Sequence, residues 1–353
     1  MQVKKAHILL LVPVLLILAL WSAVGRVGWQ IPIPVIAAKH GYLMVSGLLG
    51  TLISLERTLI LKKIWWLIIP ILSALSVVLV LAGQSRFGFF LQIVSSFLLC
   101  VLYTKQWYQY KEVFLLGLLL GSASWMISGI VLFIGNGFPG ASIWYILFLL
   151  FTIASERLEL SKFIYTPRWA QNLLLVLFAL LIFVQCIPFH WGSNHVSGVL
   201  IAGIGFWLIQ FDIVKINLKK QGFFFYTGST LIAGYIWLML SGVLMAIPLS
   251  TFYHYDAVLH SFFIGFVFSM LFAHSPIIFP ALLKITERPF TKFFYMPIVL
   301  THFLLLVRLY ADYSGNWNLR KWVGLLQVAV FVIFFMMMAY KIGIQIWKPR
   351  IKS

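Results

Sequence analysis

Long apolar stretches recur along the whole chain, and only short polar connections separate them. Each is close to the 20 or so residues that an α-helix needs to cross the hydrocarbon core of a bilayer. They predict helices over residues 7–24, 35–61, 64–83, 87–104, 113–135, 141–160, 169–189, 196–214, 227–248, 254–281, 293–313 and 321–343. The pattern predicts an all-α fold: a polytopic membrane bundle of about twelve transmembrane helices, with residues 1–353 forming a single integral membrane domain.

Two of these helices end in a similar polar motif. LISLERTLIL contains Glu56-Arg57, and TIASERLELS contains Glu156-Arg157. We interpret both as ion pairs at helix ends. When His40 is superposed on His260, the tenth helix becomes a third copy, so the spacing indicates three repeats of four helices over 1–110, 111–220 and 221–343. The core of the haem–copper oxidases has the same plan, but this is an analogy between folds and not evidence of function.

Composition and charge agree with a membrane protein. Hydrophobic residues make up 62% of the chain and charged residues 10%, which excludes a soluble domain of this length. The net charge of +18 is concentrated in connections on one side of the predicted bundle, beginning with Lys4 and Lys5. The positive-inside rule therefore places both termini in the cytoplasm. We attribute the charge to topology and to attraction for anionic lipid, so the predicted partner is the lipid bilayer and not nucleic acid.

Histidines inside the apolar stretches carry the candidate chemistry. His260 and His274 share the segment YDAVLHSFFIGFVFSMLFAHSPIIFPALLK, and His40 lies in an earlier one. On a continuous α-helix, His260 and His274 would fall within about 40° of each other and about 21 Å apart along the axis. An ionisable residue inside the membrane is a functional-site hypothesis by default, although a single histidine is more often a hydrogen-bonded packing residue.

Depth in the bilayer sorts these histidines into two layers. His40 and His260 lie at similar depth on helices that run in the same direction, which favours a pair of axial ligands for a haem in the outer half. His274 and His302 lie in the inner half. They could form a second haem or metal site, or a polar pocket without metal, and the sequence leaves both interpretations open.

Two further features have open alternatives. Arg308 could pair with Asp312 one helical turn later, or it could bind a haem propionate through its two nitrogens. The small residues of the early helix, including Gly47 and Gly50, could serve close helix packing or could leave room for a flat macrocycle. Gly265 raises the same question in the tenth helix.

Several kinds of chemistry have no signature in the chain. No run of intramembrane acids suits a proton pump, the sixth helix has no histidine, and no nucleotide-binding loop, Ser–His–Asp arrangement or HExxH motif occurs. Respiratory oxygen reduction is therefore not expected. Cys100 and Cys186 fall near opposite ends of the predicted helices, so a disulfide between them is not expected either.

The C-terminal segments HSFFIGFVFSMLFAHSPIIFPALL and YMPIVLTHFLLLVRLYADY resemble the signature of the NnrS family. These are twelve-helix bacterial membrane proteins with haem and copper, associated with the nitric oxide response. The positions that match the signature are His260, Gly265, Met270, His274 and Arg308, together with His40, Gly47 and Gly50 of the early helix. The chain departs from the family at Gly41, where an acid is usual, and at Ala273-His274-Ser275-Pro276.

The resemblance implies haem, with copper as a further metal, and a role in response to or protection from nitric oxide. It leaves open whether the protein is an enzyme with redox activity at the iron or only binds a diatomic ligand. The leading alternative is a permease for a small molecule or metal, in which the repeats would serve alternating access. A second alternative is an assembly factor for a respiratory complex.

Overall fold

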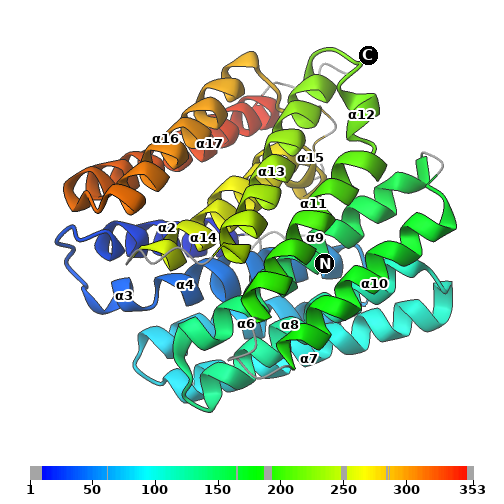
Figure 1. Cartoon of the computed structure of the whole chain (residues 1–353), viewed down its shortest axis with the longest axis horizontal. Coiled ribbons are helices and arrows are strands. Elements are labelled where there is room, and N and C mark those ends of the chain that lie inside the picture. Colours follow the sequence, from blue (N-terminus) through cyan, green and yellow to red (C-terminus); the bar gives the residue numbers. More distant parts are fainter. Residues whose placement is uncertain are drawn as a thin grey trace. The chain divides into compact units, whose positions relative to one another are not determined.

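The computed structural model describes residues 10–61, 63–163, 166–186, 193–247, 253–283, 285 and 287–347. Every regular element within these ranges is a helix, as predicted, and no strand occurs among them (Figure 1). The helices gather into two compact units, Met1–Glu159 (unit 1) and Leu160–Ser353 (unit 2). Apolar segments favour helices because a helix satisfies its backbone hydrogen bonds internally, where no water is present to do so.

Unit 1 begins with the short apolar helix α2 and continues through a long helical segment broken into α and π sections. The elements are α2 (Leu11–Arg26), α3 (Val35–Ala38), α4 (His40–Tyr42), the π-helix η1 (Leu43–Gly50), α5 (Thr51–Leu59), η2 (Ile64–Leu67), α6 (Ile68–Leu81), α7 (Ser85–Tyr110), α8 (Val113–Phe133) and α9 (Gly137–Leu160). Within this unit α6 packs on α7, and α7 packs on α8.

Unit 2 also contains a helix with a π section. Its elements are η3 (Ser161–Phe163), α10 (Arg168–Gln185), α11 (Ser193–Phe211), α12 (Val214–Asn217), α13 (Phe223–Ala246), α14 (His254–His260), the π-helix η5 (Ser261–Phe268), α15 (Ser269–Leu283), η6 (Lys292–Phe294), α16 (Tyr295–Ser314) and α17 (Trp317–Trp347). Helix α16 ends at Gly315, whose φ of 67° is the left-handed conformation typical of a glycine after a helix. This tight turn lets α17 pack along α16 (Figure 1).

Ten helices in the described ranges are long and apolar enough to cross a membrane. They span Ile64–Leu81, Ser85–Tyr110, Val113–Phe133, Gly137–Leu160, Arg168–Gln185, Asn194–Phe211, Phe223–Ala246, His254–Ala281, Lys292–Ser314 and Trp317–Gln345. Each coincides with a predicted span. The other two predicted spans, 7–24 and 35–61, contain α2 and the segment His40–Leu59, so the count of twelve and the three repeats of four remain predictions.

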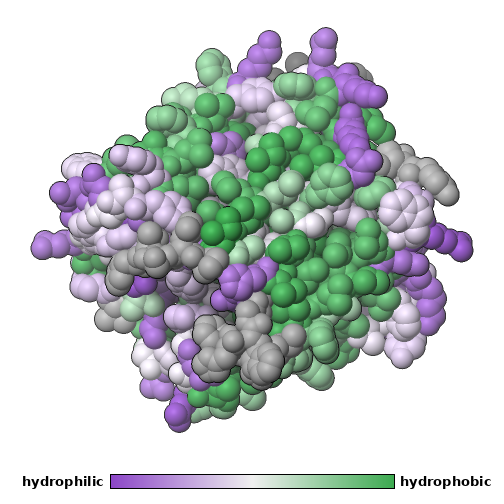
Figure 2. Space-filling view, viewed as in Figure 1, coloured by the Kyte–Doolittle hydropathy of each residue, from purple (hydrophilic) through white to green (hydrophobic). Residues whose placement is uncertain are grey.

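Large apolar side chains lie exposed on these helices, and Figure 2 shows apolar residues over much of the visible face. Examples are Phe183 (64% exposed), Phe206 (62%), Val299 (62%) and Met336 (65%). Contiguous apolar surface of this kind marks an interaction with a membrane or another protein. Exposed apolar helices of this length define a multi-helix membrane protein.

The glycines of the two histidine-bearing helices serve close packing. A Cβ added at Gly50 would lie 2.5 Å from the Trp125 ring, and one at Gly265 would lie 2.6 Å from Trp237. At Gly47 the nearest atom, from Val77, would be 2.9 Å away. Side chains of the same unit therefore fill the space beside these glycines, which confirms the close-packing interpretation and removes the need for a macrocycle to explain them.

Candidate haem-ligand histidines

His260 lies in a buried charge network of unit 2, where α14, α16 and α17 meet. Its Nδ1 is 2.9 Å from the backbone carbonyl of Asp256, one helical turn earlier, and 3.2 Å from the Asp256 carboxylate. A carbonyl oxygen only accepts hydrogen bonds, so Nδ1 carries the proton. The lone pair of the neutral ring is therefore on Nε2, which lies 3.4 Å from Nη2 of Arg308.

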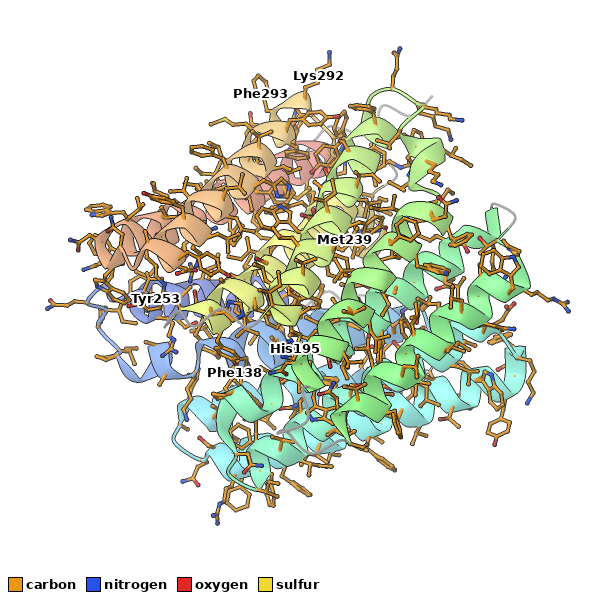
Figure 3. The ribbon with its side chains drawn as sticks, viewed as in Figure 1. Phe138, His195, Met239, Tyr253, Lys292 and Phe293 are labelled. Carbon is orange, nitrogen blue, oxygen red and sulfur yellow. The ribbon has the colours of Figure 1, made fainter. Side chains whose placement is uncertain are left out.

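Asp256 is the centre of this network. Its Oδ2 accepts hydrogen bonds at 2.9 Å from Arg308 and at 2.9 Å from Arg320. The side chains of the two arginines are only 5% and 10% exposed. The Arg320 guanidinium also stacks over the ring of Tyr253, 4.5 Å from its centroid, at the start of α14 (Figure 3). A single carboxylate thus ties three helices together and orients His260.

The sequence-based pairing of Arg308 with Asp312 is not what the structure shows. Arg308 donates to Asp256 on α14 and, at 3.3 Å, to Gln327 Oε1 on α17. Asp312 instead accepts from Arg320 Nε at 2.8 Å. The reason is that the turn at Gly315 brings Arg320 back beside α16, where its guanidinium reaches the buried Asp312. The propionate interpretation of Arg308 remains a prediction.

Three polar atoms of the same network are buried without a hydrogen-bond partner: Arg308 Nε, Gln327 Nε2 and Asp312 Oδ2. Their residues are 4%, 1% and 1% exposed. Buried groups of this kind are rare in native proteins and call for an explanation such as a bound water or ligand. All three lie on α16 and α17, around Arg308.

His40 has the same hydrogen-bond arrangement within unit 1. Its Nδ1 is 3.0 Å from Ser22 Oγ on α2, and that hydroxyl donates its one proton to the Ala19 carbonyl at 2.6 Å. Nδ1 of His40 must therefore be the donor to Ser22, which leaves the lone pair on Nε2. A histidine that ligates a metal typically donates its other ring N–H to a protein oxygen in this way.

The two inner-layer histidines differ from each other. His274 Nδ1 lies 2.7 Å from the Met270 carbonyl, which again places the proton on Nδ1 and the lone pair on Nε2. In His302, Nδ1 accepts a hydrogen bond from Trp237 Nε1 at 3.0 Å, so the proton lies on Nε2. This Nε2 is buried without a hydrogen-bond partner. The ligand roles of His274 and His302 remain predictions.

Each histidine predicted as a haem ligand precedes a π-helix of eight residues. His260 directly precedes η5, and His40 opens the turn that leads into η1. The prediction that His260 and His274 share a face within about 40° assumed a continuous α-helix, and this premise is wrong because η5 lies between them. Single π turns inside α-helices are frequently found at functional sites.

Other candidate features are simpler. Among the described residues, no group of three or more His, Cys, Asp or Glu side chains could hold a metal ion. The two cysteines are free, as predicted.

Arg57 donates to Glu156 at 2.8 Å and to Glu159 at 3.2 Å, so the repeated Glu–Arg motifs form ion pairs. These pairs join the two motifs to each other.

Several residues around the histidines were not predicted from the sequence. Asp256 could have been recognised in the sequence, because an acid one turn before a histidine in an apolar segment is itself unusual. No sequence pattern points to Ser22 or Gln327, since their contacts depend on which helices become neighbours. Arg308 and His260, predicted for one site, do lie in contact.

The fold and these contacts define a multi-helix membrane protein with half-buried histidines, three of which are hydrogen-bonded through Nδ1 to protein oxygens. The chain belongs to the family described as Domain of unknown function (DUF8744), whose model matches residues 5–342. No curated protein matches the chain. No solved structure matches it either.

Proposed function

We propose that this protein is a haem protein of the bacterial cytoplasmic membrane, with both termini in the cytoplasm, in which His40 and His260 supply the axial nitrogen ligands. One arrangement that the two histidines share supports the proposal: Nδ1 lies within hydrogen-bond distance of a protein oxygen, 3.0 Å from Ser22 Oγ in His40 and 2.9 Å from the Asp256 carbonyl in His260, so Nε2 is the nitrogen that would bind iron. Neutral imidazole held in this tautomer by a second hydrogen bond is the form in which histidine binds metals.

The residues around each histidine would act on a haem in defined ways. Ser22 and Asp256 orient the two imidazole rings and fix the proton on Nδ1. Nη2 of Arg308 lies 3.4 Å from Nε2 of His260, so the guanidinium would move aside for iron to bind there, and its positive charge would then suit the carboxylate of a propionate. The side chains of His260 and Asp256 are 19% and 24% exposed, so the helices restrict the access of water to this site without excluding it. When bound, haem would supply one-electron redox chemistry and a binding position for a diatomic molecule such as nitric oxide.

The physiological role that follows is a response to, or protection from, nitric oxide. Copper would be a second metal, with His274 as a candidate ligand, because its Nδ1 is also hydrogen-bonded to a backbone carbonyl and imidazole suits copper. Whether the protein turns over a substrate depends on whether the iron has an open coordination position. His40 and His260 would hold the haem, which would supply electron transfer or a binding position for nitric oxide.

The test is the visible absorption of the full-length protein purified from haem-replete cells, together with its iron and copper content. We expect a Soret band that is lost or strongly shifted in His40→Ala and in His260→Ala. His195→Ala is the matched control, because His195 is an exposed histidine whose Nδ1 lies 2.5 Å from a backbone carbonyl. A Soret change on adding nitric oxide to the reduced protein would support the physiological role.

A colourless and fully folded wild-type protein would overturn the proposal. In that case transport of a small molecule into proteoliposomes would favour the permease. Stable co-purification with a respiratory complex, with unchanged nitric oxide tolerance in the histidine variants, would favour the assembly factor.

A further inference from the structure

A half-open cavity of about 170 Å³ lies in unit 1, where η2 begins and α7 ends. Its polar lining consists of Lys63, Lys105, Gln106 and Gln109, and Trp66 contributes an aromatic wall. Among the residues that the structure describes, no acid lines it. The cavity is separate from the histidines and takes no part in the proposed haem chemistry.

Both lysines of the cavity are available to a ligand. Lys63 and Lys105 are exposed, and within the described ranges neither has an ion-pair or hydrogen-bond partner. Lys111, a few residues further along, behaves differently. Its ammonium lies over the rings of Trp107 and Tyr108, 4.3 and 4.7 Å from their centroids. The cavity therefore holds two positive charges that nothing in the described protein neutralises.

The cavity lies at the level where two membrane spans end. Lys63 directly precedes the span Ile64–Leu81, and Lys105 is in the last part of the span Ser85–Tyr110. Trp65 and Trp66 stack beside it with ring centroids 3.9 Å apart. Tryptophan is enriched at the membrane–water interface, where lipid phosphates also lie. The positive-inside rule places this end in the cytoplasm, and the cytoplasmic leaflet is rich in anionic lipid.

We propose that this cavity binds a phosphate group, with the ammonium groups of Lys63 and Lys105 as charge partners and the amides of Gln106 and Gln109 as hydrogen-bond donors. The phosphate could belong to the headgroup of an anionic phospholipid or to a soluble phosphate. The two ammonium groups would repel a choline cation, and no acid among the described lining residues would offset that repulsion. The site therefore distinguishes phosphatidylglycerol from phosphatidylcholine.

The test compares wild-type full-length protein with the Lys63→Gln/Lys105→Gln double variant. Bound phosphatidylglycerol and phosphatidylcholine are counted by native mass spectrometry from mixed detergent micelles. A lysine near an anionic lipid surface changes affinity by about fivefold, so the double variant should retain at least tenfold less phosphatidylglycerol. The control Lys111→Gln removes the same kind of charge outside the cavity and should retain wild-type amounts. Lys63→Arg/Lys105→Arg keeps both charges and should also retain the lipid, which separates loss of charge from misfolding.

A second arm identifies the source of the phosphate. Inorganic phosphate is titrated calorimetrically into the protein held in phosphatidylcholine nanodiscs. Binding that the double glutamine variant lacks would assign the site to a soluble phosphate, and retention of phosphatidylglycerol without such binding would assign it to lipid. Equal retention of phosphatidylglycerol by wild type and double variant, together with no phosphate binding, would overturn the proposal.

Discussion

Replacing Asp256 with Asn tests whether the charge network of unit 2 stabilises the fold. The carboxylate accepts from two arginines through one oxygen, each at 2.9 Å, and lies 3.2 Å from His260 Nδ1. Removing one partner of a buried ion pair costs about 3–5 kcal/mol, because the remaining charge stays buried without compensation. The Asp256 side chain is 24% exposed, so water can partly solvate the arginines and the cost should be near the lower value.

A loss of about 3 kcal/mol corresponds to a fall of roughly 6–12 °C in the apparent melting temperature for a unit of this size. The assay is thermal unfolding of the detergent-solubilised protein followed by circular dichroism, with haem content recorded so that loss of a cofactor is separated from loss of the ion pairs. Glu287→Gln is the matched control, since it removes one negative charge from an exposed residue. A shift below about 1 °C for Asp256→Asn would refute the reasoning.

Three further predictions use the same purified protein. Arg57→Gln breaks bonds to two glutamates of α9, and the 16% exposure of the arginine side chain implies a loss of about 2–3 kcal/mol; unchanged melting would contradict this. Gly50→Ala places a Cβ 2.5 Å from the Trp125 ring and should cost about 1–3 kcal/mol by overpacking. A Cβ at Gly203 would have no heavy atom within 4 Å, so Gly203→Ala should be neutral or should stabilise the protein by up to about 1 kcal/mol. Equal effects at the two glycines would show the packing argument to be wrong. His302→Phe should leave haem and metal content unchanged, because its proton lies on Nε2; loss of the Soret band or of copper would contradict that assignment.

Hydropathy predicted the helices well because the thickness of the bilayer sets their length and the apolar surroundings require internal backbone bonding. Ten predicted spans coincide with helices of sufficient length. The π sections could not be predicted in this way. A change from i→i+4 to i→i+5 bonding depends on side-chain packing around the helix and leaves no periodic signal in a uniformly apolar stretch.

The sequence predicted the depth of the candidate site residues in the bilayer, but not which side chains they contact. Counting residues from the helix ends placed His260 and Arg308 at a similar level, and their contact at 3.4 Å agrees with this. The i,i+4 spacing of Arg308 and Asp312 suggested a local pair, yet Arg320 bonds Asp312 and Asp256 bonds Arg308. Which side chains meet across helices depends on how each helix is rotated about its axis, and hydropathy along a membrane span carries little information about that rotation.

The π-helices set the angular register between the two ends of the helices that contain them. In a π-helix each backbone bond joins residues five apart, so each turn holds more residues than a turn of α-helix. The direction in which His40 points relative to the Glu56-Arg57 end therefore depends on how much of Leu43–Gly50 keeps the π geometry. The same dependence relates His260 to His274, which lie on either side of Ser261–Phe268. A substitution that converts either segment to an α-helix would turn the histidine before it towards a different neighbour, even though the histidine itself is unchanged.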